Sequence, residues 1–141
     1  MCLELVKEYP DADLEVIKYA AILHDIGGQK EIKDKSGRTD HALIGAEMAG
    51  FILRDFGLTD EKIKHVQECI ISHRFKTENQ PKTIEAKILF DADKLDAIGA
   101  IGAARAFVWV GNNNAKIYYK PENLEEYIKK FKRKNKWQDT R

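Results

Sequence analysis

The stretch Ala20–Gly28 places a histidine and an aspartate side by side at the end of an apolar helical segment, directly before two glycines. Positions 17, 20, 21 and 24 follow the i, i+3, i+4, i+7 spacing of one helix face, which predicts that His24 points toward the core. Burying an imidazole or a carboxylate alone is costly, so the pair must be hydrogen-bonded, ion-paired or bound to a metal. An isolated pair of this kind is most often a satisfied core histidine, and the rest of the chain decides which meaning applies.

The apolar period is helical along the whole chain, and no segment is typical of a β-strand. A short N-terminal helix is predicted to end at Tyr9-Pro10. The polar run 29–39 is predicted to be a loop that lies over a site, and the helix that begins after Thr83 is expected to continue, weakened, through two glycines. Further helices are expected to begin at Asp11 or Asp13, at Thr39 or Asp40, at Thr59 and at Pro121.

Three other helical faces each carry one side chain that can bind a metal. His41 starts the face of residues 44, 45, 48 and 52, His73 closes the face of residues 63, 66 and 70, and Asp93 lies among residues 86, 89, 90 and 97. Helices packed with their apolar faces together would bring these side chains and the His24-Asp25 pair to one centre. A metal ion would neutralise the buried carboxylates there. Nitrogen and oxygen ligands without thiolate favour Mn²⁺, Fe²⁺, Co²⁺, Ni²⁺ or Mg²⁺ over a structural zinc.

Composition narrows the class of protein. The 141 residues are 43% apolar and 33% charged, which is typical of one soluble globular domain. The net charge of +1 argues against a nucleic-acid polymer as partner. Cys2 and Cys69 read as reduced thiols of a cytoplasmic protein, and the longest apolar run, 97–104, is too short to cross a membrane. A homodimer remains open.

Two stretches resemble the anchor motifs of the HD-domain metal-dependent phosphohydrolases, in particular the small stand-alone members similar to nucleotide hydrolases. These are Leu23–Gly27 and Asp91–Gly99, and the intervening histidines of that subgroup resemble His41 and His73. The resemblance covers residues 14–107 and implies an all-α, HD-domain-like helical bundle with a metal site between the helices.

The same resemblance implies a set of metal ligands. Carried over residue by residue, they are His24, Asp25 and Asp93. In relatives with two ions His41 and His73 would bind the second ion, and in relatives with one ion they would face the substrate phosphate.

The implied activity is metal-dependent hydrolysis of a nucleotide or another small phosphate ester or anhydride. Asp25 or Asp96 would orient or deprotonate the attacking water, and Lys94 completes the catalytic set. Arg74 and Lys30 join the two intervening histidines as candidates for binding the substrate phosphate.

Three other functions remain as alternatives. They are a catalytically weak sensor of metal or nucleotide, a di-iron oxygenase on the same scaffold, and a plain helical interaction module. The last would require five buried His and Asp residues to satisfy one another, which disfavours it.

One feature departs from the resemblance. The family pattern begins with a histidine about one helix before the His-Asp pair, and no histidine precedes His24. We therefore expect residues 1–141 to form a single HD domain that lacks the family's N-terminal helix and its C-terminal end, with the missing histidine encoded upstream of Met1.

Overall fold

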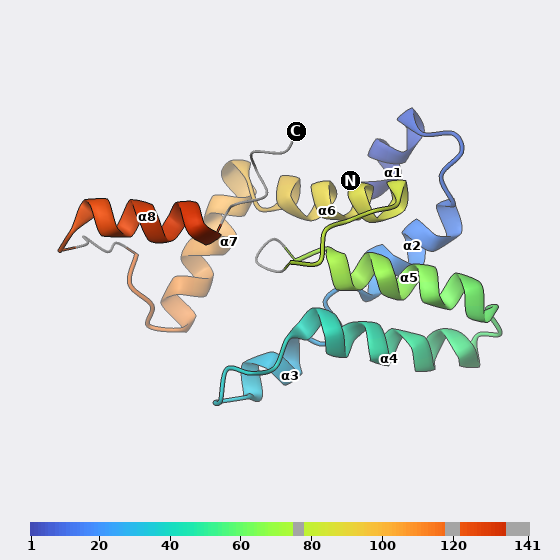
Figure 1. Ribbon diagram of the computed structural model, residues 1–141, viewed down its shortest axis with the longest axis horizontal. Helices are drawn as coiled ribbons and strands as arrows, with labels where there is room; N and C mark the ends of the chain where they lie inside the picture. Colours follow the sequence, from blue (N-terminus) through green and yellow to red (C-terminus); the bar gives the residue numbers. More distant parts are fainter. Residues whose placement is uncertain (75–77, 118–121, 135–141) are drawn as a thin grey trace. The chain divides into compact units, whose positions relative to one another are not determined.

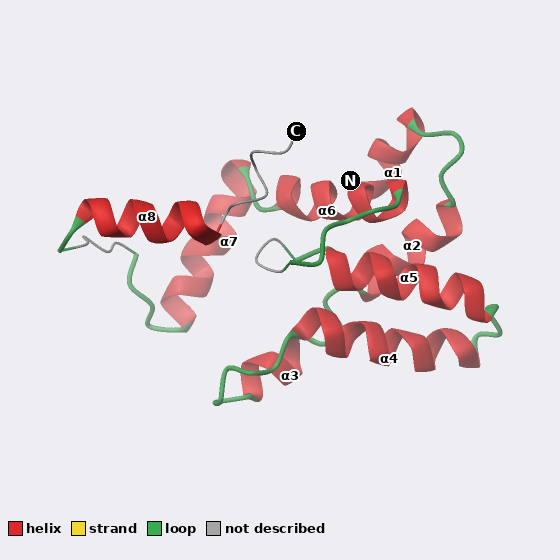
Figure 2. Cartoon of the chain, viewed as in Figure 1, coloured by secondary structure: helices red, strands yellow, loops and turns green. Residues whose placement is uncertain are grey.

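The computed structural model describes residues 1–74, 78–117 and 122–134. Within these ranges all regular structure is helical and no strand is present (Figure 2). The prediction of an all-α fold is confirmed. The helices, labelled in Figure 1, are α1 (Cys2–Leu5), the 3₁₀ turn η1 (Val6–Glu8), α2 (Leu14–Leu23), α3 (Gly28–Lys33), α4 (His41–Asp55), α5 (Asp60–Ser72), α6 (Ile84–Asp96), α7 (Gly99–Asn112) and α8 (Leu124–Lys134).

Capping residues set where the helices of the first part begin. In α2, α4, α5 and α6 a side-chain oxygen accepts a hydrogen bond from a backbone N–H two or three residues ahead. Each such cap contributes about 1 kcal/mol to helix stability. The caps are Asp13 rather than Asp11, Asp40 rather than Thr39, and Thr59 and Thr83 as predicted. Pro121, the predicted start of the last helix, lies outside the described residues.

The chain divides into two compact units, Met1–Ala97 and Ile98–Arg141. The helix that begins after Thr83 was expected to continue through Gly99, and this is wrong, because α6 ends at Asp96 and α7 begins at Gly99. Gly99 has φ +78°, a conformation that residues with a side chain rarely adopt. A single domain over residues 1–141 stays a prediction.

The core of the first unit lies between α2, α4, α5 and α6. Helices α4 and α5 are joined by residues 56–59 and lie side by side (Figure 1). Fully burying a side chain such as Leu53 or Ile70 contributes about 1.5–3 kcal/mol. The buried cluster consists of Val16, Ala20, Ala46, Ala49, Leu53, Ile63, Val66, Cys69, Ile70, Ala86 and Leu89.

The buried face of α4 differs from the predicted one. Residues 44, 45, 48 and 52 were expected to face the core together with His41. Gly45 is buried as predicted, but the other four are only partly buried. The buried residues of α4 are instead Ala42, Gly45, Ala46, Ala49, Gly50 and Leu53. Small side chains allow α4 to approach its neighbours closely, so the helix turns its alanines and glycines inward together with Leu53, and residues 44, 48 and 52 lie at the boundary.

The polar run 29–39 is not a loop throughout. Residues Gly28–Lys33 form the short helix α3, which corrects the sequence prediction. The turn that follows is held by Asp34, whose carboxylate accepts backbone N–H hydrogen bonds from Ser36, Arg38 and Thr39. The hydrogen bonds from Ser36 and Thr39 lower the pKa of Asp34. This segment is therefore ordered and holds α3 in a defined place next to α4.

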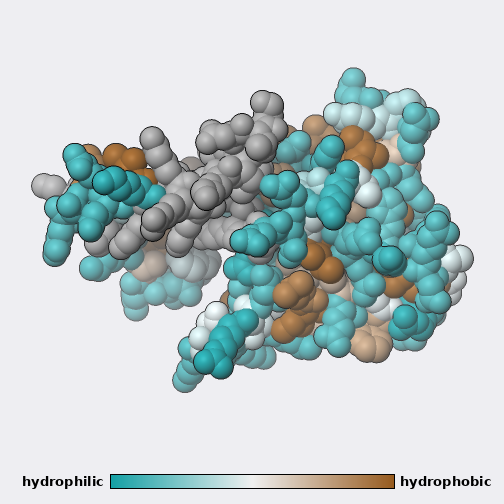
Figure 3. Space-filling model, viewed as in Figure 1, coloured by the Kyte–Doolittle hydropathy of each residue, from teal (hydrophilic) through white to brown (hydrophobic). Residues whose placement is uncertain are grey.

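The surface is mainly hydrophilic on the face drawn in Figure 3, with smaller hydrophobic patches between hydrophilic side chains. In the second unit α7 exposes Ile101, Phe107, Val108 and Trp109. None of the described helices combines the length and the apolar character that crossing a lipid bilayer requires.

Candidate metal centre

The turn after α2 carries the first two candidate ligands and packs against the start of α4. His24 is the C-cap of α2, and residues 24–27 form tight turns before α3. A Cβ built on Gly27 would lie 2.3 Å from the carbonyl oxygen of His41 and 2.8 Å from the backbone nitrogen of Gly45. Only a residue without a side chain permits this approach. Gly27 therefore sets the distance between the His24-Asp25 pair and His41.

Three histidines at this turn and its neighbours have the same protonation pattern. In His24 and His73 the Nδ1 atom lies 2.9 and 2.5 Å from the backbone carbonyl oxygen three residues earlier. In His41 the Nδ1 atom lies 2.5 Å from Oε2 of Glu31. Carbonyl and carboxylate oxygens only accept, so each Nδ1 donates its proton. In the neutral ring each Nε2 is then left with a free lone pair.

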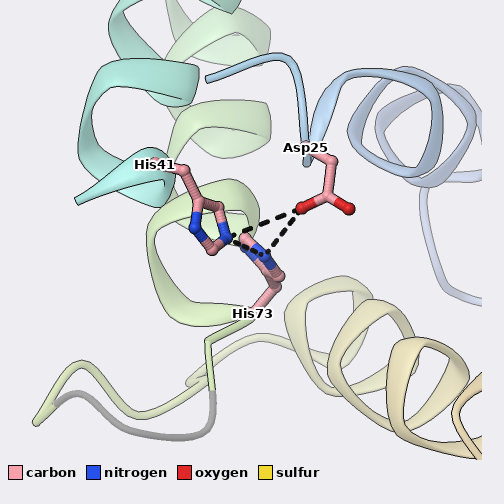
Figure 4. A group of neighbouring side chains, drawn as sticks. All are labelled: Asp25, His41 and His73. Carbon is pink, nitrogen blue, oxygen red and sulfur yellow. Dashed lines mark hydrogen bonds and ion pairs between the residues drawn. The ribbon is translucent and has the colours of Figure 1, made fainter. Parts of the chain in front are cut away.

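The Nε2 atoms of His41 and His73 face each other and a carboxylate oxygen of Asp25 (Figure 4). The two nitrogens are 3.2 Å apart, and Oδ1 of Asp25 lies 3.5 Å from the first and 3.7 Å from the second. Three electron-pair donors this close repel one another unless a shared proton or a metal ion lies among them. Two atoms bound to one ion at about 2.1 Å each can be at most about 4.2 Å apart. The separations therefore fit a divalent metal.

The cluster combines an ionised carboxylate with a buried histidine. Hydrogen bonding with His73 lowers the pKa of Asp25 to about 2, burial opposes this shift, and the neighbouring charges of His24 and His41 add to it. The Asp25 side chain is 68% exposed, whereas His73 is 3% exposed. The cluster is consequently open to solvent on the side of Asp25 and closed on the side of His73, as the entry of a ligand requires.

The second oxygen of Asp25 faces His24, which in turn lies near Asp93. Nε2 of His24 lies 3.5 Å from Oδ2 of Asp25 and 4.0 Å from Oδ1 of Asp93. Asp25 thus lies between two sets, with His41 and His73 at Oδ1 and His24 at Oδ2. Among the described residues, the group whose ligand atoms all lie within 4.8 Å of one another is Asp25, His41 and His73. Which set holds a first ion stays a prediction.

Lys94 supports this centre from α6. Its Nζ lies 2.6 Å from Oδ2 of Asp93 and 2.7 Å from the backbone oxygen of His73, and it stands 4.5 Å above the ring of Phe90. Lys94 therefore ties Asp93 to the end of α5. Asp96 is the exposed last residue of α6, and its catalytic role stays a prediction.

Arg74 binds two carboxylates next to the cluster. One terminal nitrogen lies 2.8 Å from Oε1 of Glu31, and the other lies 3.2 Å from Oδ1 of Asp40. Burial raises the pKa of Glu31, but the hydrogen bonds with His41 and Arg74 outweigh that effect and lower it. Lys30, the other predicted phosphate ligand, is exposed on α3. The sequence prediction misses Glu31 because the paired glycines and the surrounding charged residues are typical of a loop, whereas Gly28–Lys33 form a helix.

Features outside the centre have other roles. His65 lies 3.1 Å from Oγ1 of Thr83 and 3.2 Å from Oε2 of the buried Glu85, so it belongs to the packing of α5 on α6. A cavity of about 390 Å³ beside the same two helices is lined by residues that include Ser72 and Thr83. None of the candidate ligands lines it.

Comparison with known proteins shows the family and the fold of the chain. The model of the family "HD domain" matches residues 1–98, nearly the same residues as the first compact unit. A crystal structure described as a predicted HD superfamily hydrolase from an uncultured Thermotogales bacterium is 30% identical, with a TM-score of 0.63 over 94% of this chain and 71% of that chain.

Two curated relatives extend the comparison. The uncharacterized protein YpgQ of Bacillus subtilis is 32% identical over 117 residues, which cover 80% of this chain and 54% of YpgQ. The 3'-5' exoribonuclease YhaM of Oceanobacillus iheyensis is 27% identical over 143 residues, which cover 87% of this chain and 45% of YhaM. The chain thus spans about half the length of these relatives. On the family match, the shared helical fold and the resemblance of both anchor motifs, this chain belongs to the HD-domain family.

Proposed function

We propose that this chain is a divalent-metal-dependent phosphohydrolase that acts on a nucleotide or another small phosphate ester or anhydride. The observation that carries the proposal is the convergence of His41 and His73 on one oxygen of Asp25, with His24 near the other oxygen and Asp93 4.0 Å from His24. Each set would hold one ion, with Mn²⁺, Fe²⁺, Co²⁺, Ni²⁺ and Mg²⁺ as the candidates. A bound divalent ion supplies Lewis-acid chemistry at a phosphoryl oxygen and a water of lowered pKa.

The side chains of the protein would divide the remaining work. Asp25 is ionised at neutral pH and exposed, so substrate and water reach the centre along its side. Asp25 or Asp96 would orient the attacking water. Lys94 holds Asp93 in place, and the buried His73 closes the floor of the centre to bulk water. Arg74, Lys30 and the two intervening histidines remain the proposed contacts of the substrate phosphate.

The substrate class is supported by the relatives and by charge. YhaM is named as an exoribonuclease, an enzyme that cleaves phosphodiester bonds, and the structural relative is described as a predicted hydrolase. The net charge of +1 favours a small phosphate compound over a long RNA, because binding a nucleic-acid polymer usually needs a strongly basic surface. We place this activity in the cytoplasm.

The test is phosphate release from nucleoside mono-, di- and triphosphates, with a short RNA oligonucleotide in parallel, in the presence of each candidate metal. His73→Gln should lose more activity than the roughly 10–100-fold that removal of an outer-shell partner of a metal ligand costs. His65→Gln is the matched control, because it makes the same substitution at a histidine that lies outside the centre, against Thr83 and Glu85. Equal activity of the two variants would refute the assignment, and turnover of RNA alone would refute the small substrate.

Specific contacts favour two alternative functions. Arg74 and Lys94 already pair with carboxylates of the protein, as expected of a metal or nucleotide sensor with weak turnover. Two ligand sets that share Asp25 would also suit a di-iron oxygenase. Nucleotide binding without phosphate release would identify the sensor, and iron-dependent oxygen uptake would identify the oxygenase.

A further inference from the structure

Glu31 is the one carboxylate that α3 directs toward the centre. Its two oxygens have different partners, with Oε2 lying 2.5 Å from Nδ1 of His41 and Oε1 lying 2.8 Å from a guanidinium nitrogen of Arg74. Its side chain is 30% exposed. Both oxygens are engaged with protein groups, so Glu31 does not itself face the space between the candidate ligands.

The position of His41 in its helix explains why this contact comes from another element. His24 and His73 are the C-caps of α2 and α5, and each ring donates to the carbonyl oxygen three residues earlier in its own helix. His41 is the first residue of α4 and has no helical turn before it. Its ring must therefore be oriented by an acceptor from outside the helix, and Glu31 supplies that acceptor.

We propose that Glu31 is a positioning residue that acts through His41, fixing the ring so that Nε2 faces Asp25 and His73. The inference rests on the proposed metal site. A carboxylate at Nδ1 selects the tautomer, fixes the ring plane and makes Nε2 a stronger electron-pair donor. Loss of an outer-shell partner of this kind costs about 10–100-fold in metal affinity.

Arg74 and Asp40 complete the support of Glu31. Arg74 binds Oε1 of Glu31, the oxygen that does not contact His41, and also the carboxylate of Asp40, which caps α4 immediately before His41. The ring of His41 is therefore held by Glu31, whereas Asp40 holds the start of α4 through a backbone hydrogen bond that an asparagine oxygen can also accept. Asp40 pairs with Arg74 as Glu31 does, but the hydrogen bond to the ring of His41 comes from Glu31. A substitution at Asp40 is therefore a matched control.

The experiment measures Co²⁺ affinity by calorimetry and the Co²⁺ absorption spectrum of the full chain, together with the melting temperature of the metal-free protein. Glu31→Ala should weaken Co²⁺ binding about 10–100-fold and alter the spectrum. Glu31→Gln, which keeps an oxygen acceptor but loses the charge, should fall between wild type and Glu31→Ala. Asp40→Asn keeps the helix cap and should bind Co²⁺ nearly as wild type does.

A double-mutant cycle decides whether Glu31 acts through His41. In a His41→Ala background, adding Glu31→Ala should cause no further loss of Co²⁺ affinity, because the ring that it orients is gone. Additive losses of Co²⁺ affinity would overturn the inference, as would equal losses in Glu31→Ala and Asp40→Asn. A loss of Co²⁺ affinity in Glu31→Ala that is fully explained by a lower melting temperature of the metal-free protein would overturn it too.

The failure of this inference can be told apart from the failure of the proposed function. Tight Co²⁺ binding by both wild type and Glu31→Ala would overturn only the role of Glu31. Absence of Co²⁺ binding by the wild type would overturn the metal site and this inference with it.

Discussion

Replacing Gly27 by alanine should damage both the stability of the first unit and its metal site. The new Cβ would stand 2.3 Å from the carbonyl oxygen of His41, and an ordinary contact begins at 3.4 Å, so the two segments must separate by 3.4 − 2.3 = 1.1 Å. The position of the Cβ is fixed by the backbone and its partner is a backbone carbonyl oxygen, so no rotamer change relieves the contact. The φ of Gly27 is −77°, which alanine adopts freely, and the damage would come from the clash alone.

The size of the effect follows from that displacement. Overpacking of this kind costs about 1–3 kcal/mol, which corresponds to a fall in Tm of roughly 5–20 °C for a domain of this size. If the turn moves as a body along the line that joins Oδ1 of Asp25 to Nε2 of His41, their distance grows from 3.5 Å by 1.1 Å to 4.6 Å. That exceeds the span of about 4.2 Å that one ion can bridge. Metal affinity should therefore fall together with Tm.

The neighbouring glycine provides the control. A Cβ on Gly28 would meet nothing within 4 Å, and Gly28 is the first residue of α3. Gly28→Ala should therefore leave Tm unchanged or raise it slightly, because alanine reduces the freedom of the unfolded chain. Thermal unfolding and Co²⁺ calorimetry of both variants give the comparison. Wild-type Tm and Co²⁺ affinity in Gly27→Ala would refute the reasoning, as would equal damage in Gly28→Ala.

Three further predictions concern single side chains. Asp93→Asn should weaken metal binding far more than Asp91→Asn, because Asp91 is exposed whereas Asp93 lies 4.0 Å from His24, and metal content measured on both variants checks this. In the native protein a thiol reagent should modify Cys2 but not Cys69, which is fully buried with its pKa raised to about 12, and both should react in denaturant. Burial raises the pKa of Glu85, but hydrogen bonds led by the N–H of Asp13 outweigh that effect, so the pKa is lowered. The ionised Glu85 therefore stabilises the folded protein above about pH 4.3, and this stabilisation is lost as pH falls further. Glu85→Gln should flatten the acid side of the stability profile in urea unfolding, and an unchanged slope there would contradict it.

Local chemistry in the sequence was enough to predict most of the helices. Helix starts depend on a capping side chain and the N–H groups two or three residues ahead, so Thr59 and Thr83 could be identified without tertiary information. The burial of His73 followed from spacing, because the residues at 63, 66 and 70 share its face and are all buried. The His24-Asp25 pair and its glycines were likewise visible as a local motif.

Tertiary structure alone decided the arrangement of the centre. Spacing places a side chain on a helix face but does not set its distance to another helix, so the grouping of Asp25 with His41 and His73 required the packing of α4 on α5 and on the turn at Gly27. The role of Glu31 was hidden for the same reason, since its partners lie 10 and 43 positions away along the chain. Periodicity predicted the buried face of α5 but not that of α4, because the close approach of two backbones depends on residues with little or no side chain, which leave no hydrophobic signal.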